Sequence, residues 1–181
     1  MRKILYFSEN YDIVFQGDLK GSKRYLEDSE KYVCRFCGST HKEATFTKDA
    51  HAISESIGNK SLLSYSECDE CNKIFGNGIE DHLGKFLLPL KNASAIKGKN
   101  SKPTYTSPSN ESRIDFKDGT MNIHNLENNP FVEIDNLNKT MIINYVTTPH
   151  IPAAVFKAFV KFFLSVIKED DFRNKFENVT K

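Results

Sequence analysis

Four cysteines, arranged as two pairs, constrain this chain more than any other feature. Cys34 and Cys37 form one CxxC pair, Cys68 and Cys71 form the other, and the 181 residues contain no further cysteine. Two thiolates at this spacing bind one ion when the backbone turns tightly, and the glycine after the first pair, Gly38, permits such a turn. The 30 residues between the pairs are enough for a β-hairpin. The pattern predicts one Zn²⁺ bound by all four thiolates.

Two other readings of the cysteines explain less. A thioredoxin-like redox motif uses a single CxxC pair and leaves the second pair without a role. Four unrelated buried thiols would not be expected to fall into two such pairs. A four-thiolate zinc site has no open coordination position, so we expect it to be structural and look for function elsewhere.

The N-terminus and the apolar segments indicate a cytoplasmic chain without a membrane partner. Only the four apolar residues Ile4 to Phe7 follow Met1-Arg2-Lys3, fewer than the roughly 7 to 15 of a signal peptide. The longest apolar stretch, 151–167, is interrupted by Lys157 and Lys161, so no run approaches the roughly 20 residues that span a bilayer. In a reducing compartment, disulfides between the cysteines are not expected.

The net charge gives no reason to expect nucleic acid, because 25 basic residues face 24 acidic ones. Locally, the stretch after the second cysteine pair is rich in lysine and has no acidic counterweight: Lys91, Lys97, Lys99 and Lys102. These lysines are equally well explained as a solvated linker or as contacts to a phosphate backbone.

The chain divides into four segments by composition and periodicity. Residues 1–30 suggest short strands, including one at Ile4–Phe7. Residues 31–90 contain the cysteines, and we expect there a strand at Ala44–Thr47 and one helix from Cys71 to about Pro89. Residues 91–110 form the linker or loop. Residues 111–181 contain β-hairpins, followed by an amphipathic C-terminal helix from Pro152 to Ile167. We expect an α+β fold.

Between the cysteine pairs stands His51, followed by an Ile-x-x-x-x-Gly-Asn turn that ends at Asn59. The second pair runs directly into Asn72, and Glu80 follows eight residues later. Over roughly residues 31–90 this order resembles HNH endonucleases of the zinc-bound ββα-metal type. The resemblance implies a treble-clef-like zinc module that hydrolyses phosphodiester bonds, with His51 as general base and Asn72 as a ligand of Mg²⁺ or another divalent cation.

The chemistry agrees with these roles. Phosphodiester hydrolysis needs a base that activates water and a cation that stabilises the leaving oxygen. A neutral imidazole suits the first task and a carboxamide oxygen suits the second. His51 could also be a structural histidine, and Asn72 a plain helix N-cap. In the family pattern Asn59 would orient the histidine from the hairpin loop, although an ordinary turn residue would also fit there.

The second protein ligand of the divalent cation departs from the family pattern. Many HNH proteins have Asp, Glu or His directly before the general base, where this chain has Ala50. Asp49 replaces that ligand only if the strand is bulged, because neighbouring side chains of a strand face opposite ways. Glu80 is the other candidate, since eight residues along one helix return it to roughly the face of Asn72. Both could equally be surface or packing residues.

The sequence therefore predicts a metal-dependent HNH endonuclease. DNA as substrate, and restriction or phage defence as context, are implied by the resemblance alone, and RNA stays open. A single ββα-metal unit cuts one strand, so double-strand cleavage needs a homodimer or successive nicks. Ala50 motivates the alternative, a catalytically silent zinc-stabilised module that binds nucleic acid or protein.

Overall fold

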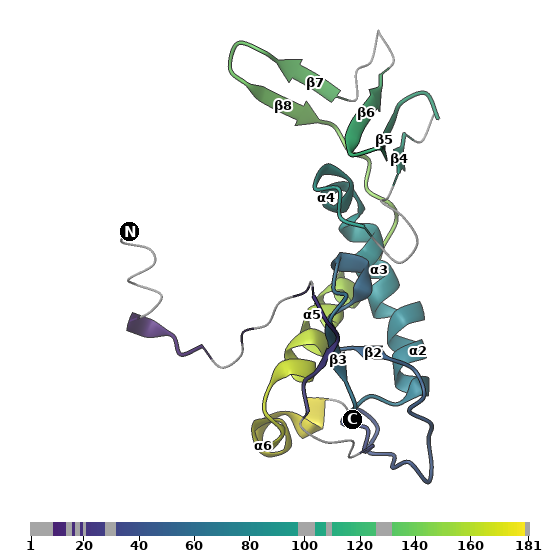
Figure 1. Cartoon of the computed structure of the whole chain (residues 1–181), viewed down its shortest axis with the longest axis vertical. Helices are drawn as coiled ribbons and strands as arrows, with labels where there is room; N and C mark the ends of the chain where they lie inside the picture. The colour runs from purple at the N-terminus through teal and green to yellow at the C-terminus, as the bar shows by residue number, and fades with distance from the viewer. Residues whose placement is uncertain are drawn as a thin grey trace.

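The computed structural model describes residues 9–13, 16, 19, 21–27, 32–97, 104–107, 110–125 and 132–179. Figure 1 shows an elongated molecule with β-hairpins at one end of the long axis and the C-terminal helices toward the other. The strand expected at Ile4–Phe7 lies outside the described residues. The described secondary structure is mixed α and β, as the sequence predicts.

A small three-stranded sheet forms the centre of the cysteine-containing module. Its strands are β1 (Arg24–Tyr25), β2 (Ala50–His51) and β3 (Leu62–Ser64), in the order β1-β3-β2. Strand β1 pairs parallel to β3, and β2 pairs antiparallel to it. β2 and β3 form the predicted hairpin between the cysteine pairs, and its loop contains the short 3-10 helix η1 (Glu55–Ile57). Strand β2 is therefore an edge strand.

The strand predicted at Ala44–Thr47 is wrong. These residues form an irregular segment that packs on the start of the next helix, where the amide of Asp69 donates to the carbonyl of Thr45 at 2.8 Å. The segment has strand character in its composition, because Thr and Phe are common in strands. The side chain of Asp69 bonds the same segment, which removes its need for a strand partner.

Three helices replace the single helix predicted from Cys71 to Pro89. They are α2 (Asp69–Asn77), α3 (Ile79–Phe86) and α4 (Leu88–Ala93). The break between α2 and α3 lies at Gly78, whose ψ of −101° is not helical. Pro89 stands in the first turn of α4 instead of ending a helix, a position that proline tolerates because the first amides of a helix have no intrahelical partner.

Two groups of hairpin strands follow α4. One sheet contains β4 (Tyr105–Thr106), β5 (Arg113–Lys117) and β6 (Thr120–His124), in that order, and β7 (Val132–Asp135) pairs with β8 (Thr140–Ile143). The turn between β5 and β6 falls on the Lys117–Thr120 stretch where the sequence predicts it. Tyr105, Ile114 and Val132 form the buried core of this part.

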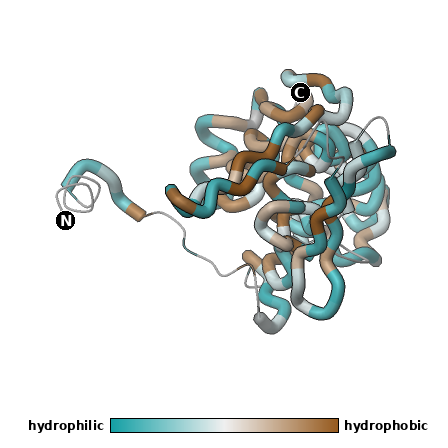
Figure 2. Tube along the Cα trace, turned by 90° about the horizontal axis from the view of Figure 1, so that it is seen from above, coloured by the Kyte–Doolittle hydropathy of each residue, from teal (hydrophilic) through white to brown (hydrophobic). Residues whose placement is uncertain are grey.

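The chain then returns to the cysteine module through α5 (Pro152–Val166), which lies beside α3 (Figure 1). Val155, Ala158 and Phe162 of α5 bury their side chains against Leu83 of α3. Figure 2 shows hydrophobic positions interspersed with hydrophilic ones along the chain, as expected of elements that bury one face. The chain continues through α6 (Glu169–Asp171), the π-helical turn η2 (Phe172–Phe176) and η3 (Glu177–Val179).

Among the described residues, no helix has both the length and the apolar character that crossing a membrane would require.

Candidate active site

The four cysteines meet in space, as predicted. Their sulfur atoms all lie within 4.8 Å of one another, and the Sγ atoms of Cys37 and Cys68 are 3.8 Å apart. Four Zn–S bonds of about 2.3 Å in a tetrahedron place sulfurs about 3.8 Å apart, so this donor set fits zinc. Gly38 has φ +77°, and its amide donates to the carbonyl of Cys34 at 2.8 Å. The glycine thus makes the tight turn that brings the first pair together.

The thiols of this cluster differ in acidity. Burial raises the pKa of Cys34 to about 11 and also raises the pKa of Cys71. For Cys37, the most exposed of the four, burial acts in the same direction, but hydrogen bonds with Ser39, and then with Cys34 and Cys71, outweigh it and lower the pKa to about 7. Because zinc binds thiolates, metal binding at this cluster would release protons.

His51 ends β2 and is half-buried. Burial lowers the pKa of its imidazole; the charge of Lys161 acts in the same direction, whereas Glu55, Asp49 and Glu80 oppose it. Within the described parts of the chain, no group forms a hydrogen bond with the imidazole. The ring is therefore neutral at neutral pH and free to accept a proton, which is what a general base requires.

Asn59 is fully buried and organises the hairpin loop that carries His51. Its Nδ2 donates to the carbonyls of Ile53 at 2.6 Å and Leu62 at 2.9 Å, and its Oδ1 accepts from the amides of Ser61 at 3.2 Å and Leu62 at 2.8 Å. The carboxamide thus uses both its donor and its acceptor end on the hairpin backbone. It has no exposed surface with which to touch a substrate.

Asp69, the first residue of α2, fixes the segment that leads into β2. Its carboxylate accepts hydrogen bonds from the hydroxyls of Thr45 and Thr47, each at 2.7 Å, and from the amides of Thr47 at 3.1 Å and Lys48 at 3.0 Å. Burial acts to raise the pKa of Asp69, but these hydrogen bonds prevail and lower it to about 2. The ionised carboxylate thereby connects the start of α2 to the approach to His51.

The two candidate cation ligands beyond Asp49 stand on different helices. Asn72 lies in α2, its side chain half-buried and without a hydrogen-bond partner in the described part of the structure. Glu80 lies in the first turn of α3, beyond the break at Gly78. The prediction that Asn72 and Glu80 share one face of a single helix is therefore wrong, and any approach between their side chains depends on the bend at Gly78.

Asp49 is occupied by other partners. Its carboxylate pairs with the ammonium of Lys23 and accepts a 2.8 Å hydrogen bond from the hydroxyl of Tyr25. The hydrogen bond from Lys23, followed by that from Tyr25, lowers the pKa of Asp49, while the bond to Asp49 raises the pKa of Tyr25 to about 12. Ala50, at the position where the family often has a ligand, is buried at 1% exposure.

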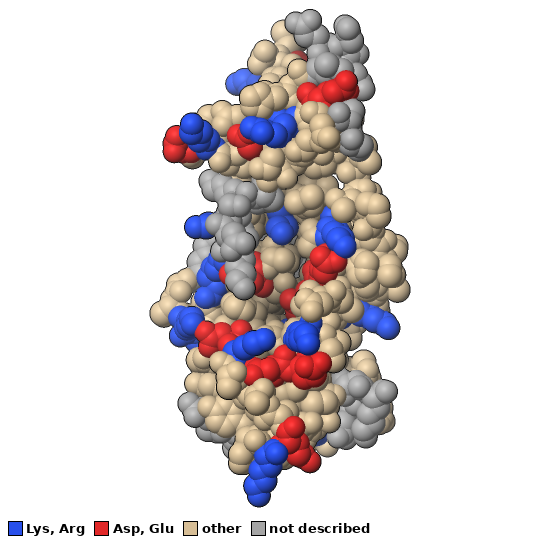
Figure 3. Space-filling model, turned by 90° about the vertical axis from the view of Figure 1, so that its right-hand side faces the viewer, with Lys and Arg blue, Asp and Glu red and all other residues tan. Residues whose placement is uncertain are grey.

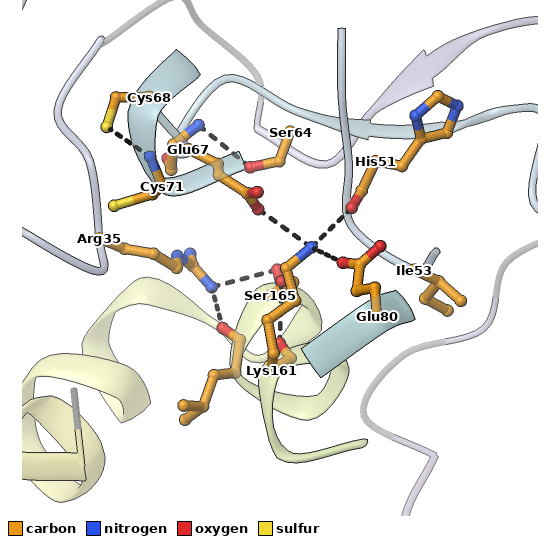
Figure 4. Close-up of polar contacts among 12 residues, drawn as sticks. Arg35, His51, Ile53, Ser64, Glu67, Cys68, Cys71, Glu80, Lys161 and Ser165 are labelled. Carbon is orange, nitrogen blue, oxygen red and sulfur yellow. Dashed lines mark hydrogen bonds and ion pairs between the residues drawn. The ribbon is translucent and has the colours of Figure 1, made fainter. Parts of the chain in front are cut away.

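A buried lysine from α5 enters the site from a distant part of the sequence. Lys161 is 3% exposed, and its Nζ donates to the backbone carbonyl of His51 at 2.8 Å. The same nitrogen is 3.1 Å from a carboxylate oxygen of Glu67 and 3.1 Å from one of Glu80. Figure 4 shows the ammonium at the centre of these three oxygens, with the imidazole of His51 directed away from it.

Arg35 makes a second connection between the cysteine module and α5. It lies between Cys34 and Cys37 and is 5% exposed. Its guanidinium donates to the carbonyls of Leu164 at 2.5 Å and Ser165 at 3.1 Å, and pairs with Glu169 at 2.9 Å. These carbonyls belong to the last turn of α5, where a cation is favoured by the helix dipole.

The lysines predicted to contact nucleic acid are only partly described. Lys91 lies in α4, and partial burial lowers its pKa; Lys97 is exposed just beyond α4; Lys99 and Lys102 lie outside the described residues. On the face shown in Figure 3, basic and acidic side chains lie next to one another instead of separating by sign.

Sequence reasoning missed three side chains that build this site: Asp69, Arg35 and Lys161. Lys161 had a detectable signal, because it falls three residues after Ala158 and four before Ser165, on the buried face of an otherwise apolar helix. A lysine at such a position must find acceptors inside the protein. Asp69 and Arg35 sit inside the CxxC pairs, and their partners in other elements leave no local signal in the sequence.

Comparison with known proteins assigns the class of this module. Residues 34–88 match the family model described as HNH endonuclease. This segment is therefore an HNH-family domain, as its cysteines, His51 and Asn72 predicted. No curated protein and no solved structure matches the chain.

Proposed function

We propose that this protein is a metal-dependent endonuclease that hydrolyses phosphodiester bonds in DNA. The observation that carries the proposal is the imidazole of His51, which has a lowered pKa and no hydrogen-bond partner among the described residues, on a short strand within an HNH-family domain. The nuclease family makes nucleic acid the expected substrate, and DNA is our choice between the two nucleic acids. A ββα-metal zinc module of treble-clef type, bounded by β2, β3 and α2, is the corresponding architecture.

In the proposed reaction His51 accepts a proton from the attacking water, and its imidazole must be neutral beforehand. Asn59 supports it indirectly by bonding the hairpin backbone from inside. Cys34, Cys37 and the second cysteine pair bind structural Zn²⁺, which ties the hairpin to α2.

A divalent cation such as Mg²⁺, when bound, would stabilise charge on the leaving 3′ oxygen. Asn72 would offer a carboxamide oxygen for it, and Asp49 or Glu80 would supply a carboxylate. For Asp49 this means leaving its present partner Lys23, whereas Glu80 pairs with Lys161 through one carboxylate oxygen and would offer the other to the cation. Of the two, Glu80 belongs to the same group of contacts as the backbone of His51, so we favour it.

The remainder of the chain would contact the nucleic acid and organise the molecule. Lys91, Lys97, Lys99 and Lys102 would add sequence-independent, salt-dependent affinity for phosphates. We propose that α5 belongs with the zinc module, on which it packs, and that the hairpins of 104–146 form a separate unit. A homodimer would allow both strands to be cut. We expect the activity to serve restriction or phage defence in the cytoplasm.

The alternative is a catalytically silent module that uses zinc to bind nucleic acid or protein. Two observations favour it: Ala50 is buried where a cation ligand often stands, and Asp49 already pairs with Lys23 and Tyr25. Both functions predict zinc and a folded module, so only chemistry on nucleic acid separates them.

The deciding experiment follows supercoiled plasmid incubated with the zinc-loaded protein and Mg²⁺ or Mn²⁺. We expect conversion to nicked circles by the wild type and none by His51→Ala or Asn72→Ala. His41→Ala, an exposed histidine of the same domain, is the matched control and should cleave like the wild type. Cleavage that survives in His51→Ala would refute the assigned base. Inactivity of the wild type, with plasmid still retarded in a gel, would support the silent module, and a protein that does neither would point to a protein partner.

A further inference from the structure

We propose that Lys161 is a positioning residue for His51, and that the active site therefore extends beyond the matched segment 34–88 into α5. This inference rests on the proposed nuclease function and deepens it, because it names a residue that acts through His51. Lys161 touches neither the imidazole nor a bound substrate. It acts on the backbone of the strand from which the imidazole projects.

The contact is made on the side of β2 that faces away from β3, where no strand of the described residues pairs with it. The sheet order β1-β3-β2 leaves β2 at the edge. The amide of Ala52 bonds the carbonyl of Leu62 across the hairpin, so His51, its neighbour, turns its own carbonyl away from β3. Lys161 donates to that outward carbonyl at 2.8 Å. The last residue of β2 is thus bonded from both sides, by β3 through its neighbours and by α5.

The ammonium of Lys161 is itself held in place by several polar groups. It donates to the carbonyl of His51 and forms ion pairs at 3.1 Å with the carboxylates of Glu67 and Glu80. Three oxygens thus surround a group that has three N–H bonds. Phe75 and Phe162 lie 5.8 and 5.9 Å from the nitrogen and close the site against water. With its side chain 97% buried, Lys161 has one position available instead of the many of a surface lysine.

Packing alone does not explain a charged group here. Buried ion pairs are commonly no more stabilising than apolar residues of equal volume, because desolvation offsets their attraction. Val155, Ala158 and Phe162 already bury apolar surface against α3 at neighbouring positions. An ammonium offers what an apolar residue cannot, a directed hydrogen bond to the His51 carbonyl and a charge between two acids. Fixing the position of that strand is therefore the role that best explains it.

The test uses full-length variants and compares cleavage with a structural probe of His51. Lys161→Met removes the charge and keeps the length of the side chain; Lys157→Met, one turn away and exposed, is the matched control. Val155→Ala weakens the same α3–α5 contact without touching the network, and so reports what destabilisation alone does. If Lys161→Met folds poorly, adding Glu67→Gln removes the buried carboxylate left without its cation.

We expect Lys161→Met to lower kcat roughly a hundredfold, since a misplacement of about 1 Å costs that much, while KM stays within about threefold. The imidazole NMR signals of His51, identified by their absence in His51→Ala, should shift in this variant and stay unchanged in Lys157→Met. Lys161→Arg should recover part of kcat. Zinc content should remain that of the wild type in every variant.

The proposal is overturned if folded Lys161→Met cleaves at the wild-type rate. It is also overturned if kcat falls no further than in Val155→Ala at an equal folded fraction, because the role is then only structural. Wild-type protein that cleaves nothing refutes the nuclease function itself. In that case the His51 NMR signals still test whether Lys161 positions His51. Unchanged signals in Lys161→Met overturn this role, and shifted signals support it independently of catalysis.

Discussion

Replacing Asn59 with alanine should destabilise the protein more than any surface substitution in the same domain. The side chain is fully buried, and its four hydrogen bonds all go to the backbone of the hairpin loop, between Ile53 and Leu62. Alanine can replace none of them. The loop would have to open to water or keep backbone polar groups without their present partner.

The size of the effect follows from these contacts. Each hydrogen bond contributes about 1 kcal/mol net, which gives about 4 kcal/mol for four bonds. The carbonyl of Leu62 keeps its bond from the amide of Ala52, so the loss at that group is smaller, and about 3 kcal/mol remains. This is a large share of the roughly 5–15 kcal/mol that stabilises a typical domain. The substitution should therefore leave a protein that folds but unfolds easily.

Urea unfolding followed by far-UV circular dichroism measures this cost, with free zinc buffered at one concentration because metal binding is coupled to folding. For a slope of about 2 kcal/mol per molar urea, the midpoint should fall by about 1.5 M. Asn77→Ala, at an exposed position in α2, is the control and should change the free energy of unfolding by less than about 0.5 kcal/mol. A loss below about 1 kcal/mol for Asn59→Ala would refute the reasoning, since the loop would then not depend on these bonds.

Three further predictions concern the frame around the site. The pKa of Asp69 is lowered to about 2 in the folded protein, below its unfolded value of about 3.9, so its stabilisation is complete above pH 4 and is lost as pH falls through 2; unfolding of Asp69→Asn should depend less on acid pH in that window. Removal of zinc by a chelator should abolish cooperative thermal unfolding of the module, and Cys34→Ser should lower the zinc content to the same degree, whereas Ser39→Ala should not. Arg35→Met should lower the free energy of unfolding by about 3 kcal/mol, since the carbonyls of Leu164, Ser165 and Ile167 lose a buried cation. Glu169→Gln, at the exposed ion-pair partner, should cost less than about 1 kcal/mol.

The cysteine cluster and the hairpin were predictable from the sequence because their signals are local. Two residues between cysteines and a following glycine fix a tight turn, wherever it lies in the fold. The 30 residues between the pairs must leave the first pair and return to the second, and the β2–β3 hairpin does this. The order of His51, Asn59 and Asn72 carried the family resemblance without any knowledge of their distances.

The rest depended on contacts between residues far apart in the sequence. The helix periodicity after Cys71 continues through Gly78, and only the packing of α3 on α5 shows why the chain bends there. Residues 44–47, which lead into β2, resemble a strand in sequence. Nothing nearby in the sequence shows that they donate hydrogen bonds to the carboxylate of Asp69. Lys161 and His51 are separated by 110 residues, a distance over which a single sequence gives no pairing signal.

The position of α5 bears on where this HNH-family module ends. The matched segment stops at residue 88, yet the carbonyl of His51 and the last turn of α5 are each bonded across the chain, by Lys161 in one direction and by Arg35 in the other. The cysteine module and α5 thus each donate one cation to the backbone of the other. If one of them is displaced, the other loses a hydrogen-bond donor. If His51 is the general base, a change in α5 that moves Lys161 changes the base without altering any residue of the matched segment. Activity measured on residues 34–88 alone would then underestimate the module, and variation in the C-terminal helix would tune catalysis.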